Sequence, residues 1–225
     1  MSKLDIQGEF EAQGCPKVEH CPLLEEVELL RERCRKLEEL SSIDALTGLF
    51  NFRHMQASLE LEMERTRRTK LPTGLIMLDL DHFKNVNTLY GHEGGNAVLA
   101  HLGKLLKEGL RVIDIPCRYG GEEFALILPN ASLGHSVLIA TRLRDLVRAR
   151  PVDLGEQHIA ITASFGVAVF NHADRDTLES FISRADRLLY EAKNSGRDRI
   201  CAEQPSPLAV EEEVTADEKK ALFST

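Results

Sequence analysis

The sequence predicts an α+β fold in which helices flank a central sheet that contains antiparallel strands. Two observations lead to this class. Short apolar segments with strand character are separated by longer segments with helical periodicity. Two of the strand-like segments flank Gly120-Gly121, a tight hairpin signal that makes its strands antiparallel neighbours. No apolar run reaches the roughly 18 residues that a membrane-spanning helix needs, so we expect no membrane partner.

Charge is concentrated at the two ends of the 225-residue chain. Residues 1–43 carry six basic and ten acidic side chains, and residues 202–225 carry two and six. The middle is therefore neutral, although the whole chain has a net charge of −8. Such a chain, with 5% aromatic residues and no Trp, is unlike proteins that wrap duplex nucleic acid or stack single strands.

The N-terminal residues predict a loose segment followed by an amphipathic helical stalk. Residues 1–22 show no period and are expected to be flexible, whereas residues 23–43 follow a heptad pattern. A β-branched residue at a with leucine at d favours a parallel two-stranded coiled coil and hence a homodimer. The a positions are Val27, Cys34 and Ser41, and the d positions are Leu23, Leu30 and Leu37. Because the pattern is short, the alternative is a helix that folds back on its own domain.

Residues 44–201 are predicted to form one domain. Its first half contains a helix at 51–69, where Phe52, Met55 and Leu59 recur at helical spacing, and a buried strand at 73–80 with the sequence TGLIMLDL. A short helix is expected at 83–89 and a glycine-rich loop at 91–95. Another helix is expected to begin at Asn96 and to continue to residue 106.

The second half of the domain begins with the two hairpin strands, at 113–119 and 123–128. A helix at 132–150, an alternating strand at 159–170 and a last helix at 177–193 follow, and Ser195-Gly196 stops that helix. The acidic tail at 202–225 is expected to be mobile or to hold a short helix at 211–222.

Two acidic corners carry the first sign of chemistry. Asp79 ends a buried strand, and Glu122 and Glu123 follow the Gly120-Gly121 hairpin. Carboxylates that converge at one edge of a sheet repel each other unless a divalent cation lies between them. Oxygen ligands suit Mg²⁺, and the glycines allow a phosphate to approach closely. The alternative for each acid alone is a solvated charge at a strand end.

Five stretches in order along the chain resemble the GGDEF family, the diguanylate cyclases. They are DALTGLFN at 44–51, DLDHFK at 79–84, Asn87 with Gly91-His92, RYGGEEF at 118–124 and AKNSGR at 192–197. The resemblance spans residues 43–200 and implies a nucleotidyl-cyclase-like catalytic domain. It also implies a reaction in which two GTP molecules, one on each subunit of a head-to-head dimer, form cyclic di-GMP and release pyrophosphate. The helix at 23–43 would then raise the effective concentration of one domain near the other.

The resemblance also implies roles for individual residues. Two Mg²⁺ (or Mn²⁺) ions per site would be held by Asp79, the backbone carbonyl of Leu80, and Glu122. Glu122 or Glu123 would help to deprotonate the attacking 3′-hydroxyl, and Lys84 would assist at the phosphates. Substrate contacts are expected from His82, Phe83, Lys84, Asn87, Asn96, Leu99, Gly120, Gly121, Lys193 and Arg197. Taken singly, Lys193 and Arg197 could instead stabilise a helix C-terminus, and Lys84 could be a surface lysine.

Asn96 departs from the family pattern, which usually has Asp at this position of the guanine pocket; Thr88 also replaces a usual Asp. A carboxylate accepts both guanine donors, whereas an amide presents one acceptor and one donor. An amide pairs well with adenine, so ATP is a possible second substrate. GTP preference, mixed products such as cyclic GMP–AMP, and a weak or inactive module therefore remain open.

Arg111-Val112-Ile113-Asp114 resembles the family's RxxD product-inhibition site, at the expected distance before Arg118. An arginine there can bind a phosphate bidentately and stack on guanine, and Arg142 is a further contact candidate. The resemblance thus implies feedback by cyclic di-GMP. The alternative is a helix-terminal Arg and a turn Asp.

Five scattered cysteines indicate reduced thiols and a cytoplasmic protein. Cys15, His20, Cys21 and Cys34 could be read as a zinc or haem sensor, but their spacing fits no standard finger. Two rival functions remain open. One is a non-catalytic receptor that binds cyclic di-GMP through Arg111 and Asp114, and the other is a scaffold that acts through its N-terminal helix.

Overall fold

The structure is a computed structural model that describes residues 26–27, 29–31, 42–154 and 157–204. The chain divides into two units, Met1–Ser41 and Ser42–Thr225. In the first unit, residues 26–27 and 29–31 are helical and exposed. The segment at 1–22, most of the predicted stalk at 23–43 and most of the acidic tail at 202–225 lie outside the described residues.

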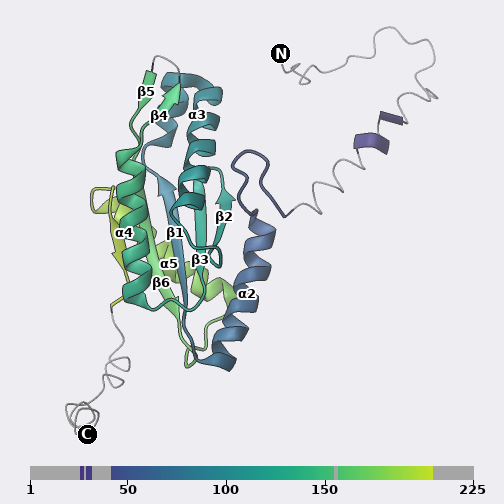
Figure 1. Ribbon diagram of the computed structural model, residues 1–225, viewed down its shortest axis with the longest axis vertical. Coiled ribbons are helices and arrows are strands. Elements are labelled where there is room, and N and C mark those ends of the chain that lie inside the picture. The colour runs from purple at the N-terminus through teal and green to yellow at the C-terminus, as the bar shows by residue number, and fades with distance from the viewer. Residues whose placement is uncertain (1–25, 28, 32–41, 155–156, 205–225) are drawn as a thin grey trace, which may run out of the picture. The chain divides into compact units, whose positions relative to one another are not determined.

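The second unit is built on a five-stranded sheet with the order β2-β3-β1-β6-β7 (Figure 1). The strands are β1 (Thr73–Leu80), β2 (Ile115–Gly120), β3 (Glu123–Leu128), β6 (Ala163–Phe170) and β7 (Ile200–Ala202). The central strand β1 pairs antiparallel with β3 and β6, and β7 pairs parallel with β6. The predicted α+β class with an antiparallel-containing sheet is therefore confirmed.

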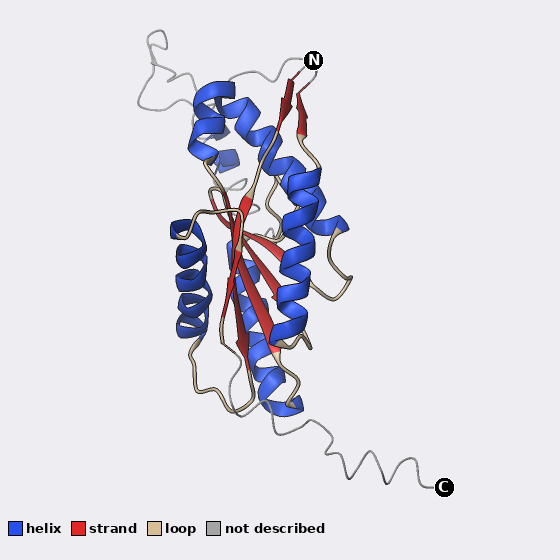
Figure 2. Ribbon diagram, turned by 90° about the vertical axis from the view of Figure 1, so that its left-hand side faces the viewer, coloured by secondary structure: helices blue, strands red, loops and turns tan. Residues whose placement is uncertain are grey.

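Helices cover both faces of this sheet (Figure 2). The helices α3 (Phe83–Glu108) and α4 (Leu133–Ala149) pack on one face, and α2 (Phe52–Thr69) and α5 (Leu178–Asn194) pack on the other. Alternate residues of β1 serve the two cores: Ile76 and Leu78 join α3 and α4, whereas Met77 joins α2 and α5. The strand order thus makes β1 the central strand of the sheet, and Asp79 lies at the end of that strand.

Capping residues fix the starts of three helices close to the predicted positions. The side chains of Asn51, Ser132 and Thr177 accept a hydrogen bond from the backbone N–H three residues later, at the starts of α2, α4 and α5. A side-chain oxygen at this position satisfies a donor that the first turn of a helix leaves open. Local sequence therefore sets these boundaries.

The region from 83 to 108 holds the two predicted helices, which together form α3 and meet at Gly91. Gly91, with φ of 70° and ψ of 177°, is not helical, so the break between the helices is shorter than the predicted loop. Residues 92–95, predicted as loop, are helical. Gly94 and Gly95 are buried, and a Cβ on either would overlap the side chain of Tyr90 or Asn87. These glycines give room for packing rather than a turn.

Two further corrections concern short strands. The predicted alternating strand at 159–170 is wrong in its pattern, since all eight residues of β6 are buried between the two helical layers. Ile159 belongs to a separate hairpin of β4 (Val152–Leu154) and β5 (Gln157–Ile159). This hairpin and β7 were not predicted, because three-residue strands are too short to show a period.

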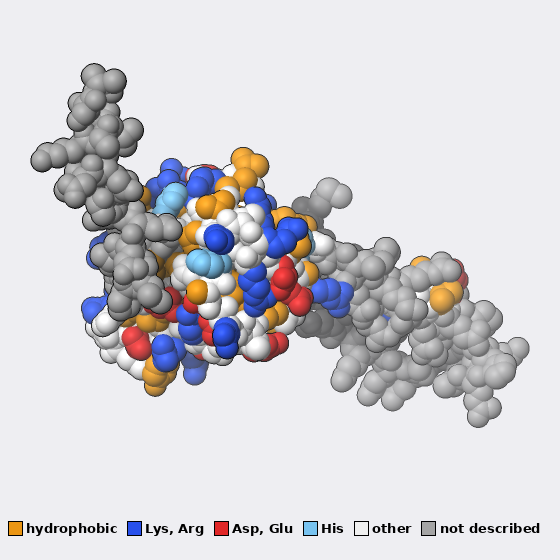
Figure 3. Space-filling model, turned by 90° about the horizontal axis from the view of Figure 1, so that it is seen from below, with side chains coloured by type: hydrophobic (Ala, Val, Ile, Leu, Met, Phe, Trp, Pro, Cys, Tyr) orange, Lys and Arg blue, Asp and Glu red, His pale blue; other side chains and the backbone are white. Residues whose placement is uncertain are grey.

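Surface features of the described residues agree with the neutral middle of the chain. On the face seen in Figure 3, basic side chains lie among acidic and apolar ones. None of the described helices combines the length and hydrophobicity that crossing a bilayer requires. Cys117 and Cys201 are free, and Cys15, Cys21 and Cys34 lie outside the described residues.

Candidate active site

The two acidic corners meet at one end of the sheet. Asp79 lies directly opposite Glu123 in the register of β1 and β3, and the N–H of Leu80 donates to the carbonyl of Glu122 over 3.4 Å. The register shifts between Arg118 and Gly120, which marks a bulge where the hairpin begins. The antiparallel pairing of β1 with β3 thus brings together acids that are more than 40 residues apart.

Asp79 carries the most perturbed carboxyl group of this site. It is buried, and burial is the main cause that raises its pKa to about 6. The Lys193 ammonium, whose Nζ lies 2.8 Å from Asp79 Oδ2, works against this rise, and the charges of Glu122 and Glu123 add to it. The corner therefore holds more negative charge than Lys193 alone compensates.

This donor set fits a hard divalent cation. The Asp79 and Glu122 carboxylates and the Leu80 carbonyl offer only oxygen atoms, which Mg²⁺ and Mn²⁺ prefer. Among the described residues, no three His, Cys, Asp or Glu side chains form a ready-made metal cage. Mg²⁺ usually takes one or two carboxylates and completes its shell with water and substrate phosphates, so a site of this size is sufficient.

The phosphate side of the site is the start of α3, which follows β1 directly. His82 precedes the helix in a left-handed conformation, with φ of 57°, and its side chain makes no capping hydrogen bond. The first N–H groups of an α-helix have no partner within the helix and favour anions. Phe83 is buried and anchors this turn in the core, whereas Lys84 is exposed.

Asp81, the second acid of the DLDHFK stretch, uses its carboxylate for hydrogen bonds within the fold. Its Oδ2 accepts from the Thr162 hydroxyl over 2.8 Å and from the Asp198 N–H over 2.9 Å. Its Oδ1 accepts from the Ser164 hydroxyl over 2.7 Å. The strand ends at Leu80, so Asp81 turns toward β6 rather than continuing beside Asp79. In the sequence, the presence of an acid at position 81 was the only sign of this structural role.

The hairpin tip is braced by a residue for which sequence reasoning assigned no role. The guanidinium of Arg118 donates to the Gly121 carbonyl over 2.8 and 3.0 Å and pairs with Asp44 Oδ2 at 3.1 Å. Burial alone would raise the pKa of Asp44, but hydrogen bonds from Thr47 and the charge of Arg118 outweigh it and lower that pKa. The DALTGLFN turn therefore supports the GGEEF hairpin.

The predicted base-pocket residues lie along the kinked helix α3. The Asn87 side chain passes over Gly95, since a Cβ on Gly95 would come within 2.0 Å of Asn87 Oδ1. Asn96, the next residue, is exposed, and Leu99 is buried one turn later in the core. Leu99 can therefore form only the wall behind a base. The structure brings Asn87 beside the segment that carries Asn96.

The closing AKNSGR stretch lies at the end of α5. Lys193 points at Asp79, so in this structure its partner is the predicted metal ligand. Arg197 is exposed and follows Gly196 in a left-handed conformation, with φ of 58°. Lys193 is thus paired with Asp79, whereas Arg197 is exposed on the turn that follows α5.

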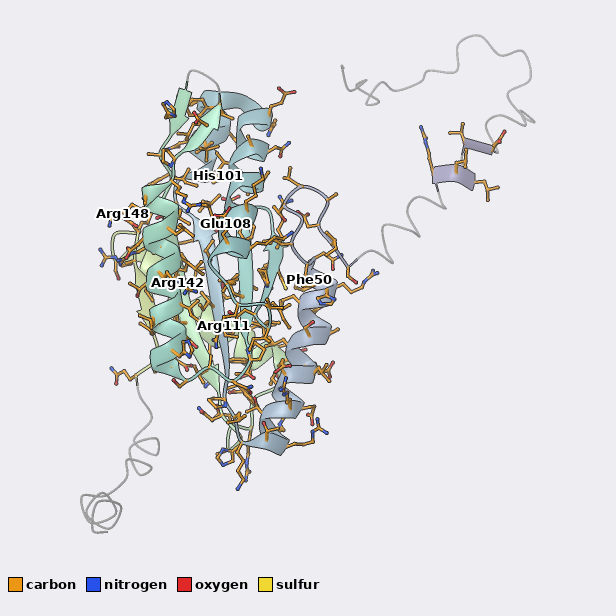
Figure 4. All side chains as sticks on the ribbon, in the orientation of Figure 1. Phe50, His101, Glu108, Arg111, Arg142 and Arg148 are labelled. Atoms are coloured by element: carbon orange, nitrogen blue, oxygen red, sulfur yellow. The ribbon has the colours of Figure 1, made fainter. Side chains whose placement is uncertain are left out.

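The predicted inhibitory residues lie together between α3, α4 and β2. The N–H of Arg111 donates to Asp114 Oδ2 over 2.8 Å, and the Arg111 Nε lies 3.5 Å from the same oxygen. Arg142 of α4 donates to the carbonyl of Gly109, two residues before Arg111 (Figure 4). Beside them is a pocket of about 420 Å³, lined by Glu108, Gly109, Arg142, Leu146 and Arg150.

Comparison with known proteins gives consistent matches. Residues 41–199 match the family described as "Diguanylate cyclase, GGDEF domain". The response regulator PleD of Caulobacter vibrioides is 38% identical over 164 residues, which cover 72% of this chain and 36% of PleD. The chain thus spans about a third of the length of this relative.

Solved structures agree with this match. The diguanylate cyclase SiaD in complex with its activator SiaC, from Pseudomonas aeruginosa, has a TM-score of 0.69 at 37% identity, over 80% of this chain and 69% of that chain. The coiled coil and GGDEF domain of DgcB from Caulobacter crescentus, in complex with c-di-GMP, has a TM-score of 0.69 at 28% identity, over 80% and 95%. The arrangement of residues 42–204 and these matches lead to one conclusion: the chain belongs to the GGDEF family of diguanylate cyclase domains.

Proposed function

We propose that the chain is a diguanylate cyclase, which condenses two GTP molecules into cyclic di-GMP and releases two pyrophosphates. The observation that carries the proposal is the meeting of Asp79 with Glu122 and Glu123 beside the start of α3. A triphosphate needs cation-binding acids on one side and N–H donors on the other, and this corner offers both. Relatives named as diguanylate cyclases support the same activity.

Asp79, the Leu80 carbonyl and Glu122 would hold the divalent cations, which we propose to be two Mg²⁺, replaceable by Mn²⁺. When bound, such cations neutralise charge on the triphosphate and lower the pKa of the 3′-hydroxyl. The surroundings of Asp79 support this assignment: burial first, and the charges of Glu122 and Glu123 second, raise its pKa to about 6, and a cation bound there would favour the ionised carboxylate.

The chain's own groups would then carry the proton and the phosphates. Glu122 or Glu123 takes the proton of the 3′-hydroxyl, whose oxygen bonds to the α-phosphorus of the other GTP as the bond to pyrophosphate breaks. The N–H groups at His82 and Phe83, with Lys84 and Arg197, would bind the phosphates. Gly120 and Gly121 leave room at the hairpin, since a Cβ on Gly121 would meet no atom within 4 Å.

Each site holds only one of the two nucleotides, so the reaction requires two subunits face to face. We propose that residues 23–43 form a parallel coiled coil and that 44–201 is the catalytic domain. Residues 26–27 and 29–31 are helical, and Val27 and Leu30 are exposed at 38% and 50%, which fits a seam that a partner would cover.

Product inhibition is proposed at Arg111, Asp114 and Arg142. The buried Asp114 side chain accepts a hydrogen bond from the Arg111 backbone N–H, and the same oxygen lies 3.5 Å from the Arg111 Nε, which would keep the half-exposed guanidinium close to this turn for a phosphate or a guanine. A bound cyclic di-GMP would connect the Arg111 loop with α4.

A second candidate function follows from Asn96. Its amide replaces the carboxylate that suits guanine, so a cyclase that also uses ATP and makes cyclic GMP–AMP is the alternative product outcome. A non-catalytic cyclic di-GMP receptor would need Arg111 and Asp114 but not the Asp79, Glu122 and Glu123 corner.

One experiment tests the proposed activity. The full chain is incubated with Mg²⁺ and GTP, ATP or both, and the cyclic dinucleotides are separated and identified. We expect cyclic di-GMP from GTP alone and none from the Glu122→Gln variant, which should remain folded. Absence of any cyclic dinucleotide with the unmodified chain would contradict the enzyme and favour the receptor.

A further inference from the structure

The turn after α5 holds an unusual run of backbone conformations. Gly196, Arg197 and Asp198 all have positive φ, at 115°, 58° and 48°. Glycine adopts such angles freely, but an arginine and an aspartate in succession rarely do. Conformations of this kind persist only where surrounding contacts hold them, and they cluster at ligand-binding sites.

Backbone contacts hold this turn on three sides. The Arg197 N–H donates to the Ala192 carbonyl over 3.1 Å, and the Asp198 N–H donates to Asp81 over 2.9 Å. The carbonyl of Arg199 accepts from the Phe165 N–H of β6 over 2.9 Å. Since Asp81 directly follows β1, the turn is tied to the strand end that carries Asp79 and Leu80.

One side chain from another layer completes these contacts. Arg148 of α4 pairs with Asp198, with 2.8 Å between Nη2 and Oδ2. The other carboxylate oxygen of Asp198 is buried and has no hydrogen-bond partner among the described residues. The Arg148 side chain is 59% exposed and that of Asp198 21%, so the pair contributes modestly, but among the described residues it is the one ion pair that the Asp198 carboxylate makes.

We propose that Arg148 is a positioning residue of the active site. Through Asp198 it holds the strained turn that aims Arg197 at the nucleotide phosphates, and Asp81 anchors the same turn to the end of β1. The inference rests on the proposed function, in which Arg197 contacts the phosphates. It assigns an active-site role to a residue of α4 outside the recognised motifs.

Nucleotide binding tests this role without turnover. The probe is the Mg²⁺ complex of GTP with a methylene group in place of the α–β bridging oxygen, and its Kd is measured by calorimetry on the full chain. We expect Arg148→Ala to raise the Kd three- to tenfold. The matched control is Arg144→Ala, because Arg144 of the same helix pairs with its neighbour Asp145 at 2.8 Å and should change the Kd less than twofold.

Two further variants separate positioning from general structure. Arg148→Lys keeps the charge and should recover at least half of the lost binding free energy. In the Arg197→Ala background, Arg148→Ala should raise the Kd by less than twofold, since no Arg197 is left to position. All variants are measured at a temperature at which thermal unfolding shows that they are folded. If Arg148→Ala is unstable, Asp198→Asn replaces it in the Kd measurement, because Asn keeps the backbone N–H and tolerates a left-handed backbone.

The outcomes distinguish this inference from the proposed activity. An unchanged Kd for folded Arg148→Ala or Asp198→Asn, or effects of Arg148→Ala and Arg197→Ala that simply add, would overturn the positioning role and leave the cyclase intact. A chain that binds the analogue as expected but forms no cyclic dinucleotide from GTP would overturn the activity alone. A chain that does not bind the analogue would overturn both.

Discussion

Two aspartates that stand two residues apart have opposite environments. Asp79 faces the hairpin acids, has one ammonium partner and a pKa raised to about 6, whereas Asp81 accepts three hydrogen bonds from neutral donors. The difference arises because β1 ends between them, at Leu80. We assign Asp79 to the cation and Asp81 to the frame around it.

The raised pKa of Asp79 predicts a pH dependence of stability in the absence of divalent cations. A folded-state pKa of about 6, above the ordinary 3.8, means that the native protein binds more protons between these values. Stability therefore falls as the pH rises from about 4 to about 6, by up to roughly 3 kcal/mol from this group. Urea unfolding of Asp79→Asn should lack this decrease.

The quantity to compare is the unfolding free energy of Asp79→Asn minus that of the unmodified chain at each pH. The two should be closest near pH 4, and the variant should gain relative stability up to pH 6 and hold it above. A difference that does not change between pH 4 and pH 7 would contradict the assigned pKa.

Asn96 predicts relaxed base choice that a single substitution should correct. Asn96→Asp restores two acceptors for the guanine donors, and a mismatched donor pair costs on the order of 1–3 kcal/mol. We expect the ratio of kcat/KM for GTP over ATP to rise roughly tenfold or more. Leu89→Asp, on the same helix and 74% exposed, is the control for added charge. An unchanged ratio in Asn96→Asp would show that the amide does not set base choice.

At the scale of elements, α3 serves two parts of the site. Its first turn offers N–H donors to phosphates, the kink at Gly91 redirects it, and the part after the kink carries Asn96. Gly95 keeps the two halves compatible by leaving room for Asn87. In the proposed function, the helix would thus join phosphate binding to base binding.

Gly95→Ala tests this packing. A Cβ there would come within 2.0 Å of Asn87 Oδ1 and 3.2 Å of Phe83, so Asn87 must move. We expect unfolding free energy to fall by about 1–3 kcal/mol and the KM for GTP to rise. In Gly134→Ala, where α4 leaves the Cβ open, stability should stay constant or rise by up to about 1 kcal/mol. Equal behaviour of the two variants would refute the role of Gly95.

The loop between α3 and β2 carries Arg111, and we expect that product inhibition can be removed there without loss of the cyclase activity. Arg111→Ala removes charge-assisted hydrogen bonds worth about 1.5–3 kcal/mol, so the inhibition constant for cyclic di-GMP should rise at least tenfold while initial rates persist. The neighbouring Val112 is fully exposed, and cyclic di-GMP should inhibit Val112→Ala as strongly as it inhibits the unmodified chain. Initial rates measured with added cyclic di-GMP decide this, and unchanged inhibition in Arg111→Ala would exclude the site.

For the whole molecule, activity should depend on dimerisation through residues 23–43. Leu30 lies on the predicted heptad seam and Leu29 lies beside it, and the two are about equally exposed, at 50% and 52%. Leu30→Lys should shift the chain toward monomer in analytical ultracentrifugation and make the rate rise with the square of protein concentration. Leu29→Lys should leave both unchanged. A Leu30→Lys chain that remains a dimer would refute the coiled coil.

The sequence by itself determined the family, the sheet class and most element boundaries. Apolar spacing located α2, β1, α4 and α5, and Asn51, Ser132 and Thr177 marked helix starts, because periodicity and capping act within a few residues. It also named the acids of the site, since their motifs are contiguous in the chain.

Only the tertiary structure decided how those residues are used. The pairing of Lys193 with Asp79, the hydrogen bond of Asp81 with Asp198 and the pairing of Arg148 with Asp198 join segments 50 to 117 residues apart. The close approach of Tyr90 to Gly94 and of Asn87 to Gly95 likewise appears only in the folded structure. Such contacts follow from strand pairing and layer packing, which bring distant segments together and which no local pattern in the sequence encodes.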